Sequence, residues 1–304
     1  PVRCFAFLNL SRCTIRSSVK SSTKPSSTLL MHNQKYEYID ALRGIAILSV
    51  VLGHSAGFLR DIHTDYSLLI DNIGARGVQL FYIVSAFTLA ISWHNRATTE
   101  KHPTINFYLR RLFRIAPMFY VAIVVSLMVN GLSARYYAVN GISCWHILLS
   151  ILLLHGFHPD TINAIVFGSW SIAVEVNFYM IFPFIINKAA TYKGLILLTI
   201  VGIALYLSAK IVVPLAFNYS EEYQYILNDF SFYNFNNQFL VFVIGLSCYL
   251  ILKTTTKSKK SLIFFVLLAL LVMPLYFIQK IPRHVTVAVF FAFFLTKLLI
   301  FKRN

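Results

Sequence analysis

The sequence predicts an all-α fold, a polytopic bundle of transmembrane helices. Hydrophobic residues make up 58% of the 304 residues. Charged residues make up 12%, about half the share that is usual in soluble domains. The mean hydropathy is +0.68, and no polar stretch is long enough to form a separate soluble domain. Since a helical span needs about 20 residues, a chain of this length can cross a membrane about eight to ten times.

About nine hydrophobic segments are expected in chain order. Six have the length of a full span and lie near residues 39–59, 74–94, 115–132, 194–217, 261–279 and 284–300. Three further segments are less regular, at 145–157, 169–187 and 238–252. The first and last of these are short, and the middle one carries Glu175. The sequence shows neither strand alternation nor an internal repeat.

The strongly positive net charge does not by itself indicate a nucleic-acid partner. It is +16, from 27 Lys and Arg against 11 Asp and Glu. In a soluble protein this excess would suggest a nucleic-acid partner. Here the basic residues lie in short loops beside apolar runs, as the positive-inside rule describes, so we expect no nucleic-acid partner. The four cysteines form no C-x-x-C pair and no His/Cys group has metal-ligand spacing, so no metal site is expected.

The basic loops predict the orientation of the chain. Lys35 and Arg43 begin the first span, residues 60–73 contain three Asp and one Arg, and residues 95–114 hold the densest basic cluster. We therefore expect a cytoplasmic N-terminus, with 60–73 outside and 95–114 inside.

The later loops constrain the number of crossings. Lys clusters at 188–193, 253–260 and 302–303 should be cytoplasmic, and the acidic stretch 221–229 should lie outside. This pattern requires residues 133–168 to cross an even number of times. Either a short run at 145–157 dips in and returns, or 145–168 crosses twice.

Residues 1–34 are expected to be a disordered or non-native N-terminal extension. The first 30 residues are rich in Ser, Thr, Lys and Arg and lack periodicity, and Met31 is a candidate natural start. The alternative is a cytoplasmic tail or targeting segment, although residues 2–8 lack a long enough apolar core for a signal peptide. Residues 35–304 are then one membrane domain.

Five polar residues lie in or at the ends of apolar segments: Arg43, His54, Gln79, Glu175 and Asn177. An ionisable group at the centre of a membrane helix costs about 2.5–3.5 kcal/mol on insertion scales, so such residues face a protein interior or a cavity and are functional candidates. Two alternatives stay open. Asp40 and Arg43 could simply pair on one helix face, and a lone intramembrane histidine could be a packing residue.

The depths of these residues predict two polar regions. Arg43 joins Arg110, Arg111 and Arg114 at the cytoplasmic side, and guanidinium groups bind phosphates in a bidentate manner. His54 lies eleven residues after Arg43, about 16 Å further along the helix axis. The expected orientation also places Trp170 and Glu175 in the outer half. We therefore expect a basic inner mouth and a His/Glu pair nearer the outer one.

Four motifs resemble those of the acyltransferase 3 family of multi-pass membrane acyltransferases. Residues 38–46 (YIDALRGIA), followed by His54, are similar to D-x-L-R-G-x-A…H, and residues 77–87 (GVQLFYIVSAF) to G-V-x-L-F-F-x-x-S-G-F. Residues 110–117 (RRLFRIAP) are similar to R-R-x-x-R-I-x-P, and residues 170–179 (WSIAVEVNFY) to W-S-L-x-x-E-x-x-F-Y. Each motif alone is weak, but the four occur in the family's order.

Two departures accompany this resemblance. Ala86 replaces the usual glycine of the second motif. The family typically closes with a span that carries a G-x-x-S-Y-x-x-Y-L-x-H-like motif, and nothing similar follows Lys302. We therefore expect the domain to be incomplete at its C-terminus, without the final family helix.

The resemblance implies an acyl-CoA donor, usually acetyl-CoA, that acts as substrate and not as a bound cofactor. It implies a carbohydrate acceptor, such as a lipopolysaccharide O-antigen, a capsule or an exported glycan, and a place in the bacterial inner (cytoplasmic) membrane. We hypothesise that Arg43, Arg111 and Arg114 hold the phosphates of coenzyme A. His54 would deprotonate the acceptor hydroxyl or carry the acyl group, because imidazole titrates near neutrality.

The remaining site residues receive supporting roles in this hypothesis. Glu175 would orient His54 or stabilise its imidazolium form, and Trp170, Ser171 and Tyr179 would line the substrate cavity. Two other functions stay open. The first is a transporter of a small anion or sugar, since intramembrane His and Glu can relay protons, although the Gly/Pro-interrupted paired segments of inverted repeats are not seen. The second is an inactive truncated remnant.

Overall fold

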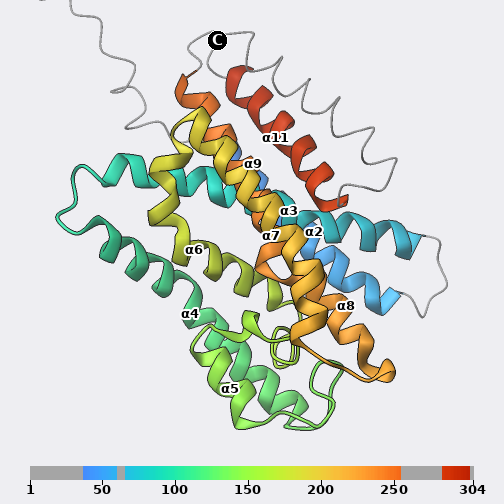
Figure 1. The fold of residues 1–304 in the computed structure, drawn as a ribbon. Coiled ribbons are helices and arrows are strands. Elements are labelled where there is room, and N and C mark those ends of the chain that lie inside the picture. The colour runs from blue at the N-terminus through green and yellow to red at the C-terminus, as the bar shows by residue number, and fades with distance from the viewer. Residues whose placement is uncertain (1–36, 60–65, 255–282, 302–304) are drawn as a thin grey trace, which may run out of the picture. The chain divides into compact units, whose positions relative to one another are not determined.

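The computed structural model of the protein describes residues 37–59, 66–254 and 283–301 (Figure 1). These residues are helices and connecting loops without a β-strand, which confirms the expected all-α fold. The expected extension 1–34, the expected span 261–279 and the basic pair at 302–303 lie outside the described residues.

The elements match the expected segments in order, although α3 and α4 begin eight and twelve residues before the segments expected at 74–94 and 115–132. In chain order they are α2 (Glu37–Leu59), α3 (Tyr66–Arg96), α4 (Pro103–Asn130), α5 (Cys144–Ile151), the 3-10 turn η2 (His155–Phe157), α6 (Trp170–Ala189), α7 (Tyr192–Ala216), η3 (Glu221–Tyr223), α8 (Gln224–Tyr233), α9 (Phe235–Thr254) and α11 (Arg283–Phe301). Among the described residues, five stretches are long and apolar enough to cross a membrane, at 76–96, 103–130, 170–189, 192–216 and 221–251. The protein is therefore a multi-pass membrane protein.

The helices α3 and α9 form the centre of the bundle. Helix α9 contacts α3, α6, α7, α8 and α11, and Figure 1 shows it running among these helices. The apolar stretches of α3 and α9 are mostly buried, whereas those of α4 and α7 are mostly exposed. A helix that is apolar all round belongs in a core or against lipid, so the outer faces of α4 and α7 are the lipid-facing ones.

A close helix contact fixes α2 on α3. A Cβ atom added to Gly74 would lie 2.2 Å from Gly53 Cα, and one added to Gly77 would lie 2.7 Å from the Ala46 carbonyl oxygen. Only glycine permits backbones to approach this closely in a helix pair. The contact aligns α2 antiparallel to α3, so that Arg43 and His54 lie at opposite ends of the same interface.

Residues 131–169 dip back along α4 and return without a crossing. Helix α5 has eight residues, about 12 Å, which is too short for a span. Tyr120 donates to the Ile151 carbonyl at 2.8 Å, and Arg135 donates to the Ile165 carbonyl at 3.0 Å. The end of α4 and the start of α6 therefore lie at the same end of the bundle. The even-crossing prediction is confirmed in its first form, and a double crossing by 145–168 is wrong.

The charged loops segregate as the sequence predicted. One end, named here the basic end, carries Arg96, Lys101, Lys188, Lys193 and Lys253. The ends of α3, α6 and α9 lie close together at the basic end, since Trp93 packs edge-on against Phe182 and His94 lies within electrostatic range of Lys253. The acidic residues of 221–229 lie at the other end, where Tyr137 donates to Asp229 at 2.7 Å.

The last described helix runs parallel to α9. His284 Nε2 lies 2.9 Å from the Asn237 carbonyl near the start of both helices, and Cys248 contacts the Ala292 carbonyl further along. Thr254 and Arg283 therefore lie at opposite ends of the bundle.

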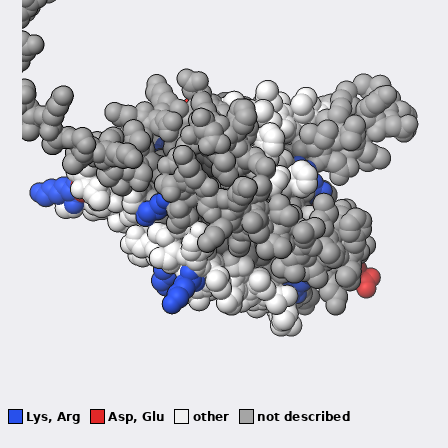
Figure 2. Space-filling model, turned by 90° about the horizontal axis from the view of Figure 1, so that it is seen from above, with Lys and Arg blue, Asp and Glu red and all other residues white. Residues whose placement is uncertain are grey.

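Figure 2 shows the molecule from above the view of Figure 1. On the face seen there, Lys and Arg atoms of the described residues lie at several places and Asp or Glu atoms at few.

Candidate active site

A buried carboxylate lies at the centre of the site. Glu175 on α6 is 8% exposed, and its carboxylate accepts a hydrogen bond from Ser85 Oγ on α3 at 2.8 Å. The hydroxyl of Tyr179, one turn further along α6, donates to the same carboxylate oxygen. A buried polar group costs free energy unless it is hydrogen-bonded, so these two donors hold Glu175 in its rotamer.

Arg111 reaches this carboxylate from α4. Its guanidinium lies 5.8 Å from the ring centre of Phe107 and 5.9 Å from that of Tyr179. Both distances are within the range of cation–π attraction. The charge of Arg111 also interacts with Glu175. Because Phe107 and Arg111 are four residues apart, they share one face of α4, and that face points to α6.

Arg43 is the residue of α2 that lies near Arg114 and Tyr179. Its guanidinium donates to Thr88 Oγ1 on α3 at 2.6 Å and to Asp40 at 3.2 Å. The pairing with Asp40 that the sequence allowed is present, but Arg43 also contacts α3 and lies within electrostatic range of Arg114 and Tyr179. The structure thus brings Arg43 and Arg111 within electrostatic range of Tyr179 and of Arg114, toward the basic end of the bundle. We call Arg43, Arg111 and Arg114 the arginine cluster.

The arginine cluster retains positive charge for a ligand. Among the described residues, neither Arg111 nor Arg114 has a carboxylate within ion-pair distance. The neighbouring Arg110 differs, because it binds Glu100 in the loop before α4 at 2.8 Å. That hydrogen bond lowers the pKa of Glu100 below its ordinary value of 4.5.

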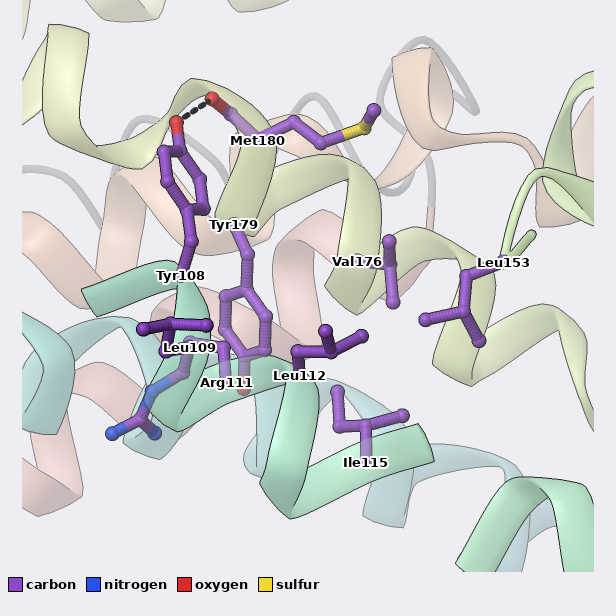
Figure 3. A pocket seen from close by; sticks show the side chains of 9 residues that line it. All are labelled: Tyr108, Leu109, Arg111, Leu112, Ile115, Leu153, Val176, Tyr179 and Met180. Atoms are coloured by element: carbon purple, nitrogen blue, oxygen red, sulfur yellow. Dashed lines mark hydrogen bonds between the residues drawn. The ribbon is translucent and has the colours of Figure 1, made fainter. Parts of the chain in front are cut away.

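A pocket opens beside Arg111 and Tyr179, between α4 and α6 (Figure 3). Its volume is about 230 Å³, and it is lined by Tyr108, Leu109, Arg111, Leu112, Ile115, Leu153, Val176, Tyr179 and Met180. In Figure 3, Arg111 and Tyr179 lie toward one side and Leu112, Ile115, Val176 and Leu153 toward the other. The Tyr108 hydroxyl donates to the Met180 carbonyl at 2.8 Å and ties the two helices together.

His54 lies at a different place from Glu175. Its ring packs edge-on against Phe167 with centres 5.2 Å apart, and a Cβ atom added to Gly168 would lie 3.1 Å from its Nε2. Gly168 has a φ of +81°, which other residues rarely adopt, so this turn both needs glycine and leaves room for the imidazole. No hydrogen bond or ion pair joins His54 to Glu175, both of which the structure describes.

Trp170 and Ser171 hold the start of α6 beside His54. The Trp170 ring stacks on Tyr233 with centres 4.5 Å apart, and its backbone N–H donates to the Asn163 side chain at 3.1 Å. The Ser171 hydroxyl donates to the Gly168 carbonyl at 3.0 Å and so closes the turn that His54 contacts. The predicted residues therefore divide into two groups. Arg43, Arg111, Arg114 and Tyr179 lie toward the basic end, and His54, Trp170 and Ser171 lie toward the opposite end. Glu175 lies between the two groups, about one turn of α6 from both Tyr179 and Ser171.

The sequence interpretation missed Ser85 and Thr88. Serine and threonine in an apolar helix commonly bond their own backbone, so a hydroxyl there gives no functional signal. Of the other polar candidates, Gln79 is fully buried and neither of its side-chain amide atoms has a hydrogen-bond partner in the described part of the chain, and Asn177 is buried beside η2. Among the described residues, no group of three or more His, Cys, Asp or Glu side chains could hold a metal ion.

A family model described as an acyltransferase domain, that of the acyltransferase 3 family, matches residues 36–302. The chain belongs to this family. The arginine cluster, the buried glutamate and His54 all lie within the matched residues.

Three similar proteins come from distant organisms. The chain is 25% identical over 172 residues to the O-acetyltransferase OatA of Staphylococcus aureus, covering 49% of this chain and 24% of that protein. It is 30% identical over 151 residues to the acyltransferase MdmB of Streptomyces mycarofaciens, covering 48% and 38%. It is 26% identical over 212 residues to a regulator of hypoxia-inducible factor 1 from Caenorhabditis elegans, covering 62% and 39%.

The chain spans well under half the length of each of these relatives. Its similarity to them therefore concerns the membrane domain. No solved structure matches the chain.

Proposed function

We propose that this chain is a membrane-embedded O-acyltransferase. It moves an acyl group, acetyl in the simplest case, from an acyl-CoA in the cytoplasm to a hydroxyl of a surface or exported carbohydrate. The observation that supports this most strongly is the arginine cluster, three cations from α2 and α4, of which Arg43 and Arg111 each lie within electrostatic range of Arg114 and also interact with Tyr179 beside the buried Glu175. The family membership supports acyl transfer, and the relative OatA is named an O-acetyltransferase.

The arginine cluster suits the phosphates of coenzyme A. Guanidinium groups bind phosphate oxygens with two parallel hydrogen bonds. Arg111 and Arg114 lack a paired carboxylate among the described residues, so an anionic ligand would supply the missing counter-charge. The basic end would face the cytoplasm by the positive-inside rule, which is the side where acyl-CoA is made available.

His54 is the proposed base or acyl carrier. The acceptor oxygen forms a bond to the thioester carbonyl carbon, the carbon–sulfur bond breaks, and the coenzyme leaves as a thiol after taking up the proton. His54 takes the hydroxyl proton, or first accepts the acyl group itself. Since His54 lies about 16 Å along α2 from Arg43, the pantetheine arm of the donor would span this length.

Glu175 receives a positioning role in this proposal. Its contacts with Ser85 and Tyr179 and its attraction to Arg111 fit a residue that fixes the arginine cluster. This differs from the role predicted from the sequence, in which Glu175 acts on His54. Trp170 and Ser171 would shape the approach to His54 for the acceptor.

The test uses the purified chain in lipid nanodiscs with acetyl-CoA and a panel of glycans. We expect release of coenzyme A, measured with a thiol reagent, together with a gain of one acetyl mass on a glycan. Folded protein that binds no coenzyme A and releases none with any acceptor would contradict the proposal. Uptake of a small anion or sugar into sealed vesicles by the same protein would instead support a transporter.

A further inference from the structure

The pocket between α4 and α6 lies on a lipid-facing surface. Of its lining residues, Leu109, Leu112 and Met180 expose between 43% and 46% of their surface. The rest of α4 is also largely exposed, with Met118, Val121 and Val125 among its outward side chains. In a membrane these side chains contact hydrocarbon, so the pocket opens sideways toward lipid and not toward water.

The length of α4 places Arg111 near the membrane surface. The helix has 28 residues, about 42 Å, whereas the hydrocarbon core is about 30 Å thick. About eight residues of α4 therefore extend beyond the core. Charged residues occur at 110, 111 and 114 and none follows in the helix, so the extension is at the N-terminal part of α4. Arg111 then lies at the level of lipid headgroups, while Ile115 lies within the hydrocarbon.

The lining of the pocket changes from polar at the membrane surface to apolar within the hydrocarbon. Arg111 and the hydroxyl-bearing rings of Tyr108 and Tyr179 lie at its interfacial part. Leu112, Ile115, Val176 and Leu153 form apolar walls further in (Figure 3). From Tyr108 to Ile115 the pocket follows seven residues of α4, about 10 Å. Arg111 Nε is buried without a hydrogen-bond partner among the described residues.

We propose that this pocket binds one anionic phospholipid of the leaflet at the basic end. Its phosphate contacts Arg111, and one acyl chain lies along Leu112, Ile115 and Val176. A basic pocket between transmembrane helices on the cytoplasmic side is the arrangement that holds anionic headgroups. The walls offer no partner for the amide groups of a pantetheine arm, whose burial without hydrogen bonds is unfavourable, whereas a hydrocarbon chain needs none. This inference does not depend on the proposed acyl transfer.

The lipid would have a structural effect on the site. Arg111 is shared by the pocket and the arginine cluster, since its guanidinium also packs on Tyr179. A bound lipid would fill the gap between α4 and α6 and restrain Arg111. Lipid composition would thereby influence the affinity of the arginine cluster for anions.

The test measures thermal unfolding of the purified full chain in detergent with added phosphatidylglycerol or with phosphatidylcholine of the same chains. A ligand that binds only the folded state raises the midpoint, by about 2–3 °C for a chain of this length at a tenfold excess over Kd. We expect phosphatidylglycerol to raise it by this amount more than phosphatidylcholine. Inorganic phosphate should not reproduce the rise, because it lacks the chain.

Three variants locate the effect. Leu112→Trp fills the pocket, and Arg111→Gln removes the cation; each should abolish the difference between the two lipids. Val121→Trp introduces the same side chain on the lipid-facing side of α4 outside the pocket and should keep the difference. An equal response to both lipids in the wild type would overturn the proposal. So would an undiminished difference in folded Leu112→Trp and Arg111→Gln, since the lipid would then bind at other basic residues.

Discussion

Ser85 on α3 donates a hydrogen bond of 2.8 Å to Glu175 on α6, and both side chains are buried. The bond joins helices whose residues are 90 positions apart in the chain. It also explains why a carboxylate can persist in an apolar bundle, because Ser85 and Tyr179 together satisfy one of its oxygens.

Removal of this donor should destabilise the fold. Ser85→Ala leaves a buried carboxylate with one donor fewer, and an unsatisfied buried group costs about 1–3 kcal/mol. We expect a lower unfolding midpoint in nanodiscs. The matched control is Ser208→Ala on α7, whose hydroxyl bonds only the Leu205 carbonyl of its own helix. Equal midpoints for Ser85→Ala and Ser208→Ala would show that the bond between α3 and α6 contributes nothing.

His54→Ala should abolish acyl transfer without loss of folded protein. General base or nucleophilic catalysis contributes about 10²–10⁴-fold, and no hydrogen bond within the described structure depends on His54. The measurement is coenzyme A release per folded molecule. His102→Ala, in the loop before α4, is the control and should retain full activity. Undiminished turnover of His54→Ala would reject both roles proposed for the imidazole.

The separation of His54 from Glu175 makes a further prediction about their coupling. Residues that act as one unit show strongly non-additive effects. Because Glu175 contacts Ser85 and Tyr179 instead of His54, residual activities of His54→Gln and Glu175→Gln should combine additively in the double variant. A double variant as active as the less active of the two single variants would instead indicate the direct pairing of His54 and Glu175 that the sequence suggested.

Arg111→Ala and Arg114→Ala should weaken the binding of coenzyme A. A hydrogen bond to a charged group contributes about 1.5–3 kcal/mol, so each affinity should fall about 10- to 100-fold. Lysine should rescue only partly, because an ammonium lacks the planar fork. Arg96→Ala is the control, since Arg96 lies at the same end and carries the same charge but is outside the cluster. An equal loss of coenzyme A affinity in Arg96→Ala would show that the arginine cluster acts only as part of a general basic surface.

The loop before α4 should respond to pH through Glu100. The hydrogen bond from Arg110 lowers its pKa in the folded protein, so its stabilisation is present above the ordinary value of 4.5. The stabilisation is lost as the pH falls from there through the folded pKa. Glu100→Gln should therefore lower the unfolding midpoint at pH 7, and the difference from wild type should shrink as the pH falls below 4.5. A difference that stays constant down to pH 3 would contradict this assignment.

Labelling can determine which side of the membrane each end faces. In a background without native cysteines, Tyr225→Cys should react with a membrane-impermeant reagent added outside cells, and Glu100→Cys should react only after lysis. Residue 100 lies in the loop at the basic end, and residue 225 lies beside Tyr136 at the other end. The reverse pattern would invert the proposed orientation.

The sequence alone determined the class of the protein and the order of most polar residues along the membrane axis. Hydropathy depends on local composition, so α2 and α7 could be predicted within two residues at both ends. The ends of α3 and α4 were also predicted within two residues, but these helices begin eight and twelve residues before the predicted segments, because their first turns are more polar. The charges of the loops predicted which helix ends lie on the same side of the membrane. They also required residues 133–168 to begin and end on the same side. The position of each motif along its helix also gave the arginine cluster at one end and His54 toward the other.

Only the tertiary structure decided which side chains meet. A helical sequence gives the height of a residue along the axis but not which neighbouring helix its side chain faces. That rotation depends on packing between distant segments, such as the Gly53–Gly74 contact that places α2 on α3. For this reason the partner of Glu175 was predicted as His54 and is Ser85 with Tyr179. The pocket between α4 and α6 likewise exists because residues 131–169 fold back and bring Leu153 beside Ile115 and Val176, a path set by contacts and not by local composition.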